Sequence, residues 1–194
     1  MTPVEVAAFL TGVASVWLAA RQDVWNWPVG IVNVALYAIL FWQVRLYADA
    51  GLQLVYLVLA LYGWWAWLYG GAAHTPLHVR RVPPKLLLVT VAVGAAFAAG
   101  LGLALRRYTD AAVPLLDSAL TGGSLVAQFL MTRKYLESWP IWVVLDVVYV
   151  GLFISRELYL TAALYAVFTA LALYAWREWR QSLGADDRAV AAAA

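Results

Sequence analysis

The sequence of 194 residues contains no cysteine and only two histidines, His74 and His78. The absence of cysteine excludes disulfide frameworks, thiolate metal sites and cysteine nucleophiles. Both histidines lie in one polar stretch beside Arg80 and Arg81. There is also no HExxH or GxSxG motif, which are the patterns of metalloproteases and serine hydrolases. We therefore expect a protein that is not an enzyme, with no catalytic residues, no metal site and no cofactor.

Charge is also scarce. Only 12% of the residues are charged, whereas 65% are hydrophobic and 14% aromatic, and the mean hydropathy is +0.77. A soluble domain carries about 25% charged residues, so the composition predicts an integral membrane protein whose surroundings are a lipid bilayer. The net charge is +2, and the basic residues are scattered over loops. Because they form no continuous patch, we expect no nucleic-acid partner.

Apolar runs separated by glycine, proline or charged residues predict an all-α membrane protein. The start, 1–9, lacks the basic region of a secretory signal, so we expect the first run to stay in the mature protein. We expect a single transmembrane domain over 1–180 and a disordered tail over 181–194. Prolines at three predicted helix starts fit the first turn, where a missing N–H costs nothing. Seven transmembrane helices are predicted near 4–20, 27–44, 50–69, 86–105, 115–132, 139–154 and 158–177.

The chain contains an internal repeat with an offset of 112 residues. Without a gap, residues 27–64 match residues 139–176 at 16 of 38 positions. Each repeat holds three predicted helices, so a second copy joined directly would enter the membrane upside down. The apolar helix at 86–105 has no counterpart and corrects the direction. The sequence predicts a 3+1+3 arrangement in which 86–105 connects two parallel repeats, 4–69 and 115–177, as in some secondary transporters.

Basic residues in the predicted loops indicate the orientation. One side carries four of them, Arg45, Arg106, Arg107 and Arg156, and the other side carries the remaining nine. The side richer in Lys and Arg faces the cytoplasm in most membrane proteins. We expect the N-terminus outside and the C-terminus in the cytoplasm.

Polar residues within these spans recur at helical spacing. Asp117, Thr121, Ser124 and Gln128 form one stripe, although Thr121 and Ser124 also suit helix packing. We expect five tryptophans, Trp17, Trp65, Trp67, Trp139 and Trp179, to be interfacial anchors. Asp146 is different, because a carboxylate within a span is costly and usually functional. The candidate solute-binding residues are Asn33, Tyr37, Gln53, Tyr56, Trp64, Thr121, Ser124, Gln128, Trp142, Asp146, Tyr149 and Trp176.

The residues leave three classes open. A facilitator needs a central polar and aromatic site, which these side chains can form. A membrane-embedded enzyme would need a catalytic pair, and Asp117 and Asp146 lie at different depths of their spans. A proton-coupled pump would use Asp146 or Asp49 as its carrier.

Several motifs resemble the PnuC-type vitamin transporters over about residues 4–179. The first half contains WNWPVGI at 25–31, LYAD at 46–49 and YGW at 62–64, and the second contains WPIW at 139–142 and LY at 158–159. The resemblance implies a SWEET-like fold and passive uptake of a vitamin precursor across the bacterial inner membrane. It implies nicotinamide riboside first, with thiamine or riboflavin as alternatives, and trapping by a cytoplasmic kinase. A homo-oligomer is possible. The resemblance places the central site on Asn33, Tyr37, Gln53, Tyr56, Trp64, Gln128, Trp142, Asp146 and Trp176.

The chemistry of the candidate residues agrees with this implication. Nicotinamide riboside and thiamine carry a cationic aromatic ring, which aromatic faces attract by about 2 kcal/mol when desolvated. Asp146 would add a Coulomb attraction, and the amides of Asn33, Gln53 and Gln128 suit ribose hydroxyls. No arginine lies in the middle of a predicted span. We therefore expect phosphorylated nucleotides to be rejected.

Overall fold

The computed structural model describes residues 3–43, 47–108 and 113–193. Within these ranges the chain folds into seven α-helices and one short 3-10 helix, η1 (Ala72–His74). The prolines expected near helix starts lie in the first turns of α2, α5 and α6. The all-helical class is as predicted. The helices are α1 (Pro3–Ala20), α2 (Asn26–Gln43), α3 (Tyr47–Tyr69), α4 (Pro84–Tyr108), α5 (Pro114–Thr132), α6 (Ser138–Ser155) and α7 (Tyr159–Ala193).

The surface of the helices is apolar over much of their length. Leu88, Leu103 and Val58 are among many large hydrophobic side chains that are more than half exposed. Among the described residues, four stretches are long and apolar enough to cross a membrane: α1, residues Gly51–Tyr69 of α3, α4 and α6. Asn26–Leu40 of α2 is a shorter apolar helix. Such a surface is stable against lipid tails, and the chain is a multi-pass membrane protein.

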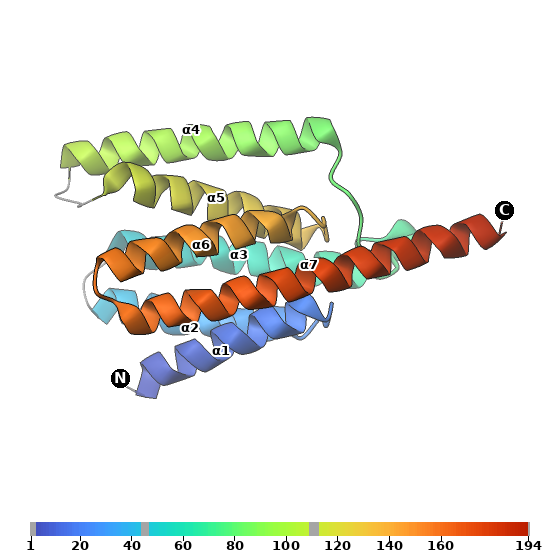
Figure 1. Cartoon of the computed structure of the whole chain (residues 1–194), viewed down its shortest axis with the longest axis horizontal. Helices are drawn as coiled ribbons and strands as arrows, with labels where there is room; N and C mark the ends of the chain where they lie inside the picture. Colours follow the sequence, from blue (N-terminus) through green and yellow to red (C-terminus); the bar gives the residue numbers. More distant parts are fainter. Residues whose placement is uncertain (1–2, 44–46, 109–112, 194) are drawn as a thin grey trace.

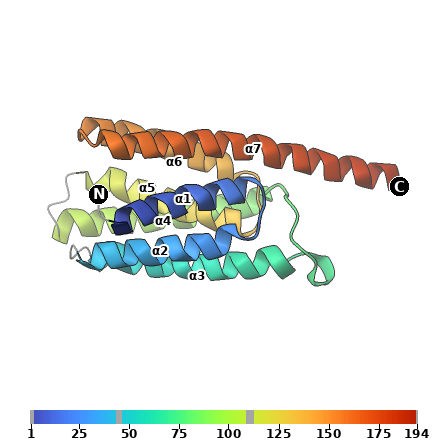
Figure 2. The same cartoon turned by 90° about the horizontal axis from the view of Figure 1, so that it is seen from below.

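Six of the helices form a ring. Successive contacts join α1 to α2, α2 to α3, α3 to α5, α5 to α6, α6 to α7, and α7 back to α1. The helix α4 packs chiefly on α5 and lies at the edge of the bundle (Figure 1), whereas α2 and α3 lie side by side (Figure 2). The halves α1–α3 and α5–α7 therefore meet along two seams, which we call the α1–α7 seam and the α3–α5 seam.

Glycines bring α4 and α5 close together. A Cβ atom on Gly122 would lie 2.7 Å from the carbonyl oxygen of Gly94, and one on Gly94 would lie 2.4 Å from Cγ2 of Val126. Small residues allow such approach between membrane helices. The packing role that the sequence suggested for the 121–124 stretch therefore applies to Gly122.

Four tryptophans pack together at one end of the ring. The Trp27 and Trp67 rings lie 5.3 Å apart, those of Trp139 and Trp179 also 5.3 Å, and Trp67 and Trp179 join the two pairs at 5.8 Å. All four are buried. The expectation of interfacial anchors was wrong for Trp67, Trp139 and Trp179, because the helix ends turn these rings inward into a shared apolar cluster.

This tryptophan cluster follows the internal repeat. Trp179 Nε1 donates to the carbonyl oxygen of Ala19 at 3.1 Å, and Trp67 Nε1 donates to that of Met131 at 3.1 Å. Trp67 and Ala19 lie 112 positions before Trp179 and Met131, respectively. Each seam is thus closed by the same bond, from the third helix of one half to the first helix of the other.

One side chain breaks this symmetry. Lys134 lies 112 positions after Gln22, and both residues have a left-handed backbone, with φ of 51° and 58°. The Lys134 side chain is only 7% exposed, and its Nζ lies 4.5 Å from the centre of the Trp67 ring. Burial lowers the pKa of Lys134 to about 8. The aromatic face offsets part of the cost of holding this cation in the α5–α6 turn.

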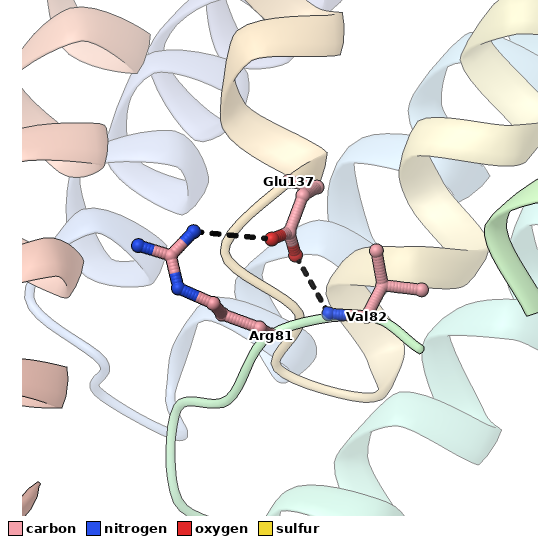
Figure 3. Close-up of polar contacts among 3 residues, drawn as sticks. All are labelled: Arg81, Val82 and Glu137. Atoms are coloured by element: carbon pink, nitrogen blue, oxygen red, sulfur yellow. Dashed lines mark hydrogen bonds and ion pairs between the residues drawn. The ribbon is translucent and has the colours of Figure 1, made fainter. Parts of the chain in front are cut away.

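The connection between α3 and α4 crosses the α5–α6 turn. Arg80 N–H donates to the carbonyl oxygen of Lys134 at 3.1 Å, and Leu136 N–H donates to that of Arg80 at 3.0 Å. Figure 3 shows Glu137 accepting from Val82 N–H at 2.9 Å and pairing with the exposed Arg81 at 3.8 Å. These bonds hold the connection against the end of the bundle that contains the tryptophan cluster.

The structure differs from the sequence prediction at the C-terminus. We expected 181–194 to lack structure, but α7 continues as a helix through Ala193 and extends beyond the other helices (Figure 2). The segment 185–193 contains five alanines, and alanine has the highest helix propensity. Local propensity therefore extends the helix past the last residues that pack on the ring.

Candidate functional site

Asp146 lies inside the ring, halfway along α6. Its side chain is 5% exposed, and Leu145 beside it is also buried. Among the described residues, no Lys, Arg or His forms an ion pair with this carboxylate. An unpaired carboxylate is costly in a membrane span and marks a functional site by default.

Tyrosines from three further helices surround this position. Tyr165 of α7 lies within electrostatic range of Asp146, of Tyr149 on α6, of Tyr56 on α3 and of Tyr37 on α2. The Tyr149 and Tyr165 rings are 4.6 Å apart. Both halves of the chain therefore contribute hydroxyl groups and aromatic faces to one place.

Ser124 joins this group from α5. The buried Ser124 side chain lies near the Tyr56 and Tyr149 hydroxyls. Ser124 therefore lies across the α3–α5 seam from Tyr56. We call the set Tyr37, Tyr56, Ser124, Asp146, Tyr149 and Tyr165 the central cluster.

Two phenylalanines extend the aromatic surface. Phe153 lies 5.8 Å from the Tyr149 ring and 5.2 Å from the Tyr165 ring, and Phe168 lies 5.7 Å from Tyr165. Sequence reasoning did not select either, because an apolar side chain in a membrane helix carries no signal of its own. Tyr165 is likewise not among the candidates named from the sequence. The spacing 149/153 and 165/168 is the signal that could have found them.

Other candidate residues lie elsewhere in the bundle. The Asn33 amide donates to the carbonyl oxygen of Ala8 at 2.6 Å and to Thr11 Oγ1 at 3.1 Å, so it ties α2 to α1. Thr121 donates to the carbonyl oxygen of Asp117 in its own helix. The contacts of Asn33 give it a structural role that the sequence did not predict, whereas helix packing was already an alternative for Thr121.

The remaining candidates are placed by their helices. Gln53 is half-buried one turn before Tyr56, and Gln128 is half-buried one turn after Ser124. Trp142 packs between the tryptophan cluster and the core around Leu145. The repeat-related pair Trp64 and Trp176 are 36% and 37% exposed. The side chain of Asp49, the alternative proton carrier, lies outside the described residues.

The central cluster lies some distance from the tryptophan cluster. Asp146 follows Trp139 by seven residues on α6, which corresponds to about 10 Å along the helix. Within the described residues, no group of three or more His, Asp or Glu could hold a metal ion. The arrangement is suited to binding a flat, polar or cationic molecule reversibly between aromatic faces.

The comparisons with known proteins decide the family. The sequence profile described as nicotinamide mononucleotide transporter matches residues 2–181. The chain belongs to this family, that of the PnuC vitamin transporters. It is 31% identical over 204 aligned positions to the nicotinamide riboside transporter PnuC of Escherichia coli, covering 92% of this chain and 85% of the relative.

Two further relatives show the breadth of the family. The riboflavin/roseoflavin transporter RibM of Streptomyces davaonensis is 27% identical over 96% of this chain and 88% of its own length. A crystal structure of the vitamin B3 transporter PnuC superposes with a TM-score of 0.73 at 23% identity, covering 93% of this chain and 82% of that one. The PnuC family member described here therefore has the transporter fold, and its relatives are transporters and not enzymes.

Proposed function

We propose that this vitamin transporter carries nicotinamide riboside, and that the central cluster binds it. The observation that carries the proposal is the unpaired Asp146 carboxylate beside the Tyr149 and Tyr165 rings. The riboside contains a positively charged pyridinium ring and no phosphate. A cation between aromatic faces gains about 2 kcal/mol once desolvated, and the carboxylate balances its charge.

The amides near the cluster suit the sugar. Gln53 and Gln128 each lie one turn from a member of the central cluster, and an amide can both donate to and accept from a ribose hydroxyl. Trp142 packs against the core that contains the tryptophan cluster and would bound the site on that side. The central cluster itself contains no Lys or Arg, so a phosphate group would be left unpaired.

Transport then proceeds by alternating access across the bacterial inner membrane, without a coupling ion. The two three-helix halves rock about the central cluster, with α4 as the connector between them. The tryptophan cluster is the closed end in this conformation, and the positive-inside rule puts that end in the cytoplasm. A cytoplasmic kinase would then phosphorylate the riboside and prevent its return.

A binding titration on the purified full-length chain tests the solute. Nicotinamide riboside should bind, and its 5′-phosphate should bind much more weakly. Asp146→Asn should weaken riboside binding about 10- to 100-fold, since a hydrogen bond or contact to a charged group contributes roughly 1.5–3 kcal/mol. Glu157→Gln, which removes an exposed carboxylate at the end of α6, should bind as the wild type does.

Riboflavin is the second candidate solute, because RibM matches almost the whole chain. Its ring is neutral, so Asp146→Asn should leave riboflavin binding nearly unchanged. Thiamine carries a cation and should respond as the riboside does. Tight riboflavin binding with no detectable riboside binding would replace our first choice.

Proteoliposomes distinguish a facilitator from a proton-coupled pump. A facilitator equilibrates the solute and returns it unaltered, whether or not a pH gradient is present. Accumulation above the external concentration that follows the pH gradient and is lost in Asp146→Asn would assign this carboxylate as a proton carrier instead.

A further inference from the structure

A separate cavity of about 300 Å³ lies at the end of the bundle that contains the tryptophan cluster. It is bounded by the last two turns of α3, by the connection that follows α3, and by the start of the α5–α6 turn. Its polar lining comes from Arg80, Arg133, His74, Tyr62 and Tyr69. Among the described residues that line it, none is a carboxylate.

The two guanidinium groups converge from different elements. Arg80 Nε donates to the carbonyl oxygen of Arg133 at 3.3 Å, and one terminal nitrogen of Arg133 donates to the Tyr62 hydroxyl. Arg80 also lies 4.7 Å above the Tyr135 ring. These contacts fix both side chains, which are half-buried, and they use only a minority of the ten N–H donors.

No anion among the described side chains neutralises this pair. Within the described chain, neither Arg80 nor Arg133 forms an ion pair, and Glu137 is bound to Val82 N–H and Arg81 instead (Figure 3). The buried Lys134 in the same turn adds a further positive charge beside Trp67. Two fixed, unneutralised guanidiniums bind phosphate groups readily, because their planar forks match phosphate oxygens.

The backbone of the cavity wall is also unusual. Ala73 and His74 both have left-handed φ values, 53° and 59°. Two consecutive non-glycine residues in that region are strained, and such strain concentrates at binding sites. Thr75 holds the turn through its hydroxyl, which donates to the carbonyl oxygen of Ala72 at 2.8 Å.

We propose that this cavity is a binding site for a phosphate group, distinct from the central cluster. We call it the Arg80/Arg133 site. The phosphate can belong to an anionic phospholipid of the adjacent leaflet or to a free phosphate ester. The lipid is placed to reach it, because Trp65 and Tyr69 on the rim are 53% and 49% exposed and aromatic side chains gather at the level of lipid headgroups. Basic pockets between helices on the cytoplasmic side bind such headgroups.

Native mass spectrometry of the full chain tests the lipid source, with phosphatidylglycerol and phosphatidylcholine added in turn. Phosphatidylglycerol should bind more tightly, and Arg80→Gln or Arg133→Gln should each weaken it about fivefold. The control Arg106→Gln/Arg107→Gln removes two exposed charges at the far end of α4 and should have no effect. Thermal shift with inorganic phosphate in lipid-free detergent tests the free source with the same variants.

Two variants separate binding from folding. Tyr62→Phe removes the contact to Arg133 but keeps both guanidiniums, so it should weaken phosphate binding less than either arginine-to-glutamine variant does. Arg133→Lys should keep part of the affinity. Binding of either probe that is lost only in the Arg80 and Arg133 variants supports the site and identifies its source. Equal binding by all variants overturns it, as does the absence of any response to inorganic phosphate together with no preference for phosphatidylglycerol over phosphatidylcholine.

Discussion

The tryptophan cluster allows a quantitative test of the internal repeat. Trp179→Phe removes an indole N–H that donates to the Ala19 carbonyl at 3.1 Å, and Trp67→Phe removes the equivalent donor to Met131. Both side chains are buried, at 0% and 3% exposure. We expect each replacement to destabilise the protein by a similar amount, with Trp67→Phe costing somewhat more because it also weakens the contact to Lys134.

The magnitude follows from two terms. A lost hydrogen bond costs about 1 kcal/mol, and the smaller ring leaves a cavity that costs about 1–3 kcal/mol. The sum, roughly 2–4 kcal/mol, corresponds to a decrease in Tm of about 4–16 °C for a chain of this size. Because the Trp67 and Trp179 rings lie 5.8 Å apart, the double variant should cost about 0.5–1.5 kcal/mol less than the two single costs added together.

The assay is thermal unfolding in detergent, with Trp64→Phe and Trp176→Phe as matched controls. These two tryptophans are also related by the repeat, but they are more than one-third exposed, so their replacement should change Tm by less than about 2 °C. The reasoning is refuted if the buried and exposed pairs lower Tm equally, or if one buried tryptophan costs several kcal/mol more than its repeat partner.

Three further predictions concern other parts of the molecule. Burial lowers the pKa of Lys134 to about 8, so the folded chain loses this proton at a lower pH than the unfolded chain does. The Tm of the wild type should therefore rise between about pH 8 and pH 10, and Lys134→Met should abolish that rise. Gly122→Val places a side chain against the Gly94 carbonyl and should destabilise the protein by about 1–3 kcal/mol, with little change in solute affinity. Gly100→Val, in open space on α4, should leave Tm unchanged in the same melting experiment. Tyr165→Leu removes an aromatic face from the central cluster and should weaken riboside binding by about 5- to 30-fold in calorimetry; an unchanged Kd would place the ring elsewhere.

Much of the fold was predictable, because the apolar runs mark the helices and the internal repeat relates the two halves. Hydropathy located all seven helices, and the 112-residue offset related the halves before any contact was known. The burial of the four tryptophans was not predicted, because the expectation for Trp near a helix end is an interfacial anchor. Trp67 and Trp179 also stand at the same offset, so an inward-facing pair was detectable from the sequence.

The central cluster was only partly predictable. Tyr37, Tyr56, Ser124, Asp146 and Tyr149 were selected because polar groups in a span need a shared face, and the structure places these five together. Asn33 met the same criterion, yet its amide bonds to α1 instead. Helical spacing predicts the face of the helix on which a polar side chain lies. It does not predict whether the neighbouring backbone or a solute is the hydrogen-bond partner of that side chain.

The two seams of the ring differ in their side-chain contacts. Both have the tryptophan bond, but the α3–α5 seam has in addition the Arg133 contact to Tyr62 and the Lys134 contact to Trp67. Two identical seams would separate together. Here three of these contacts close the α3–α5 seam, whereas one closes the α1–α7 seam. Opening at the end that contains the tryptophan cluster should therefore start between α1 and α7, with the opposite edge serving as the pivot.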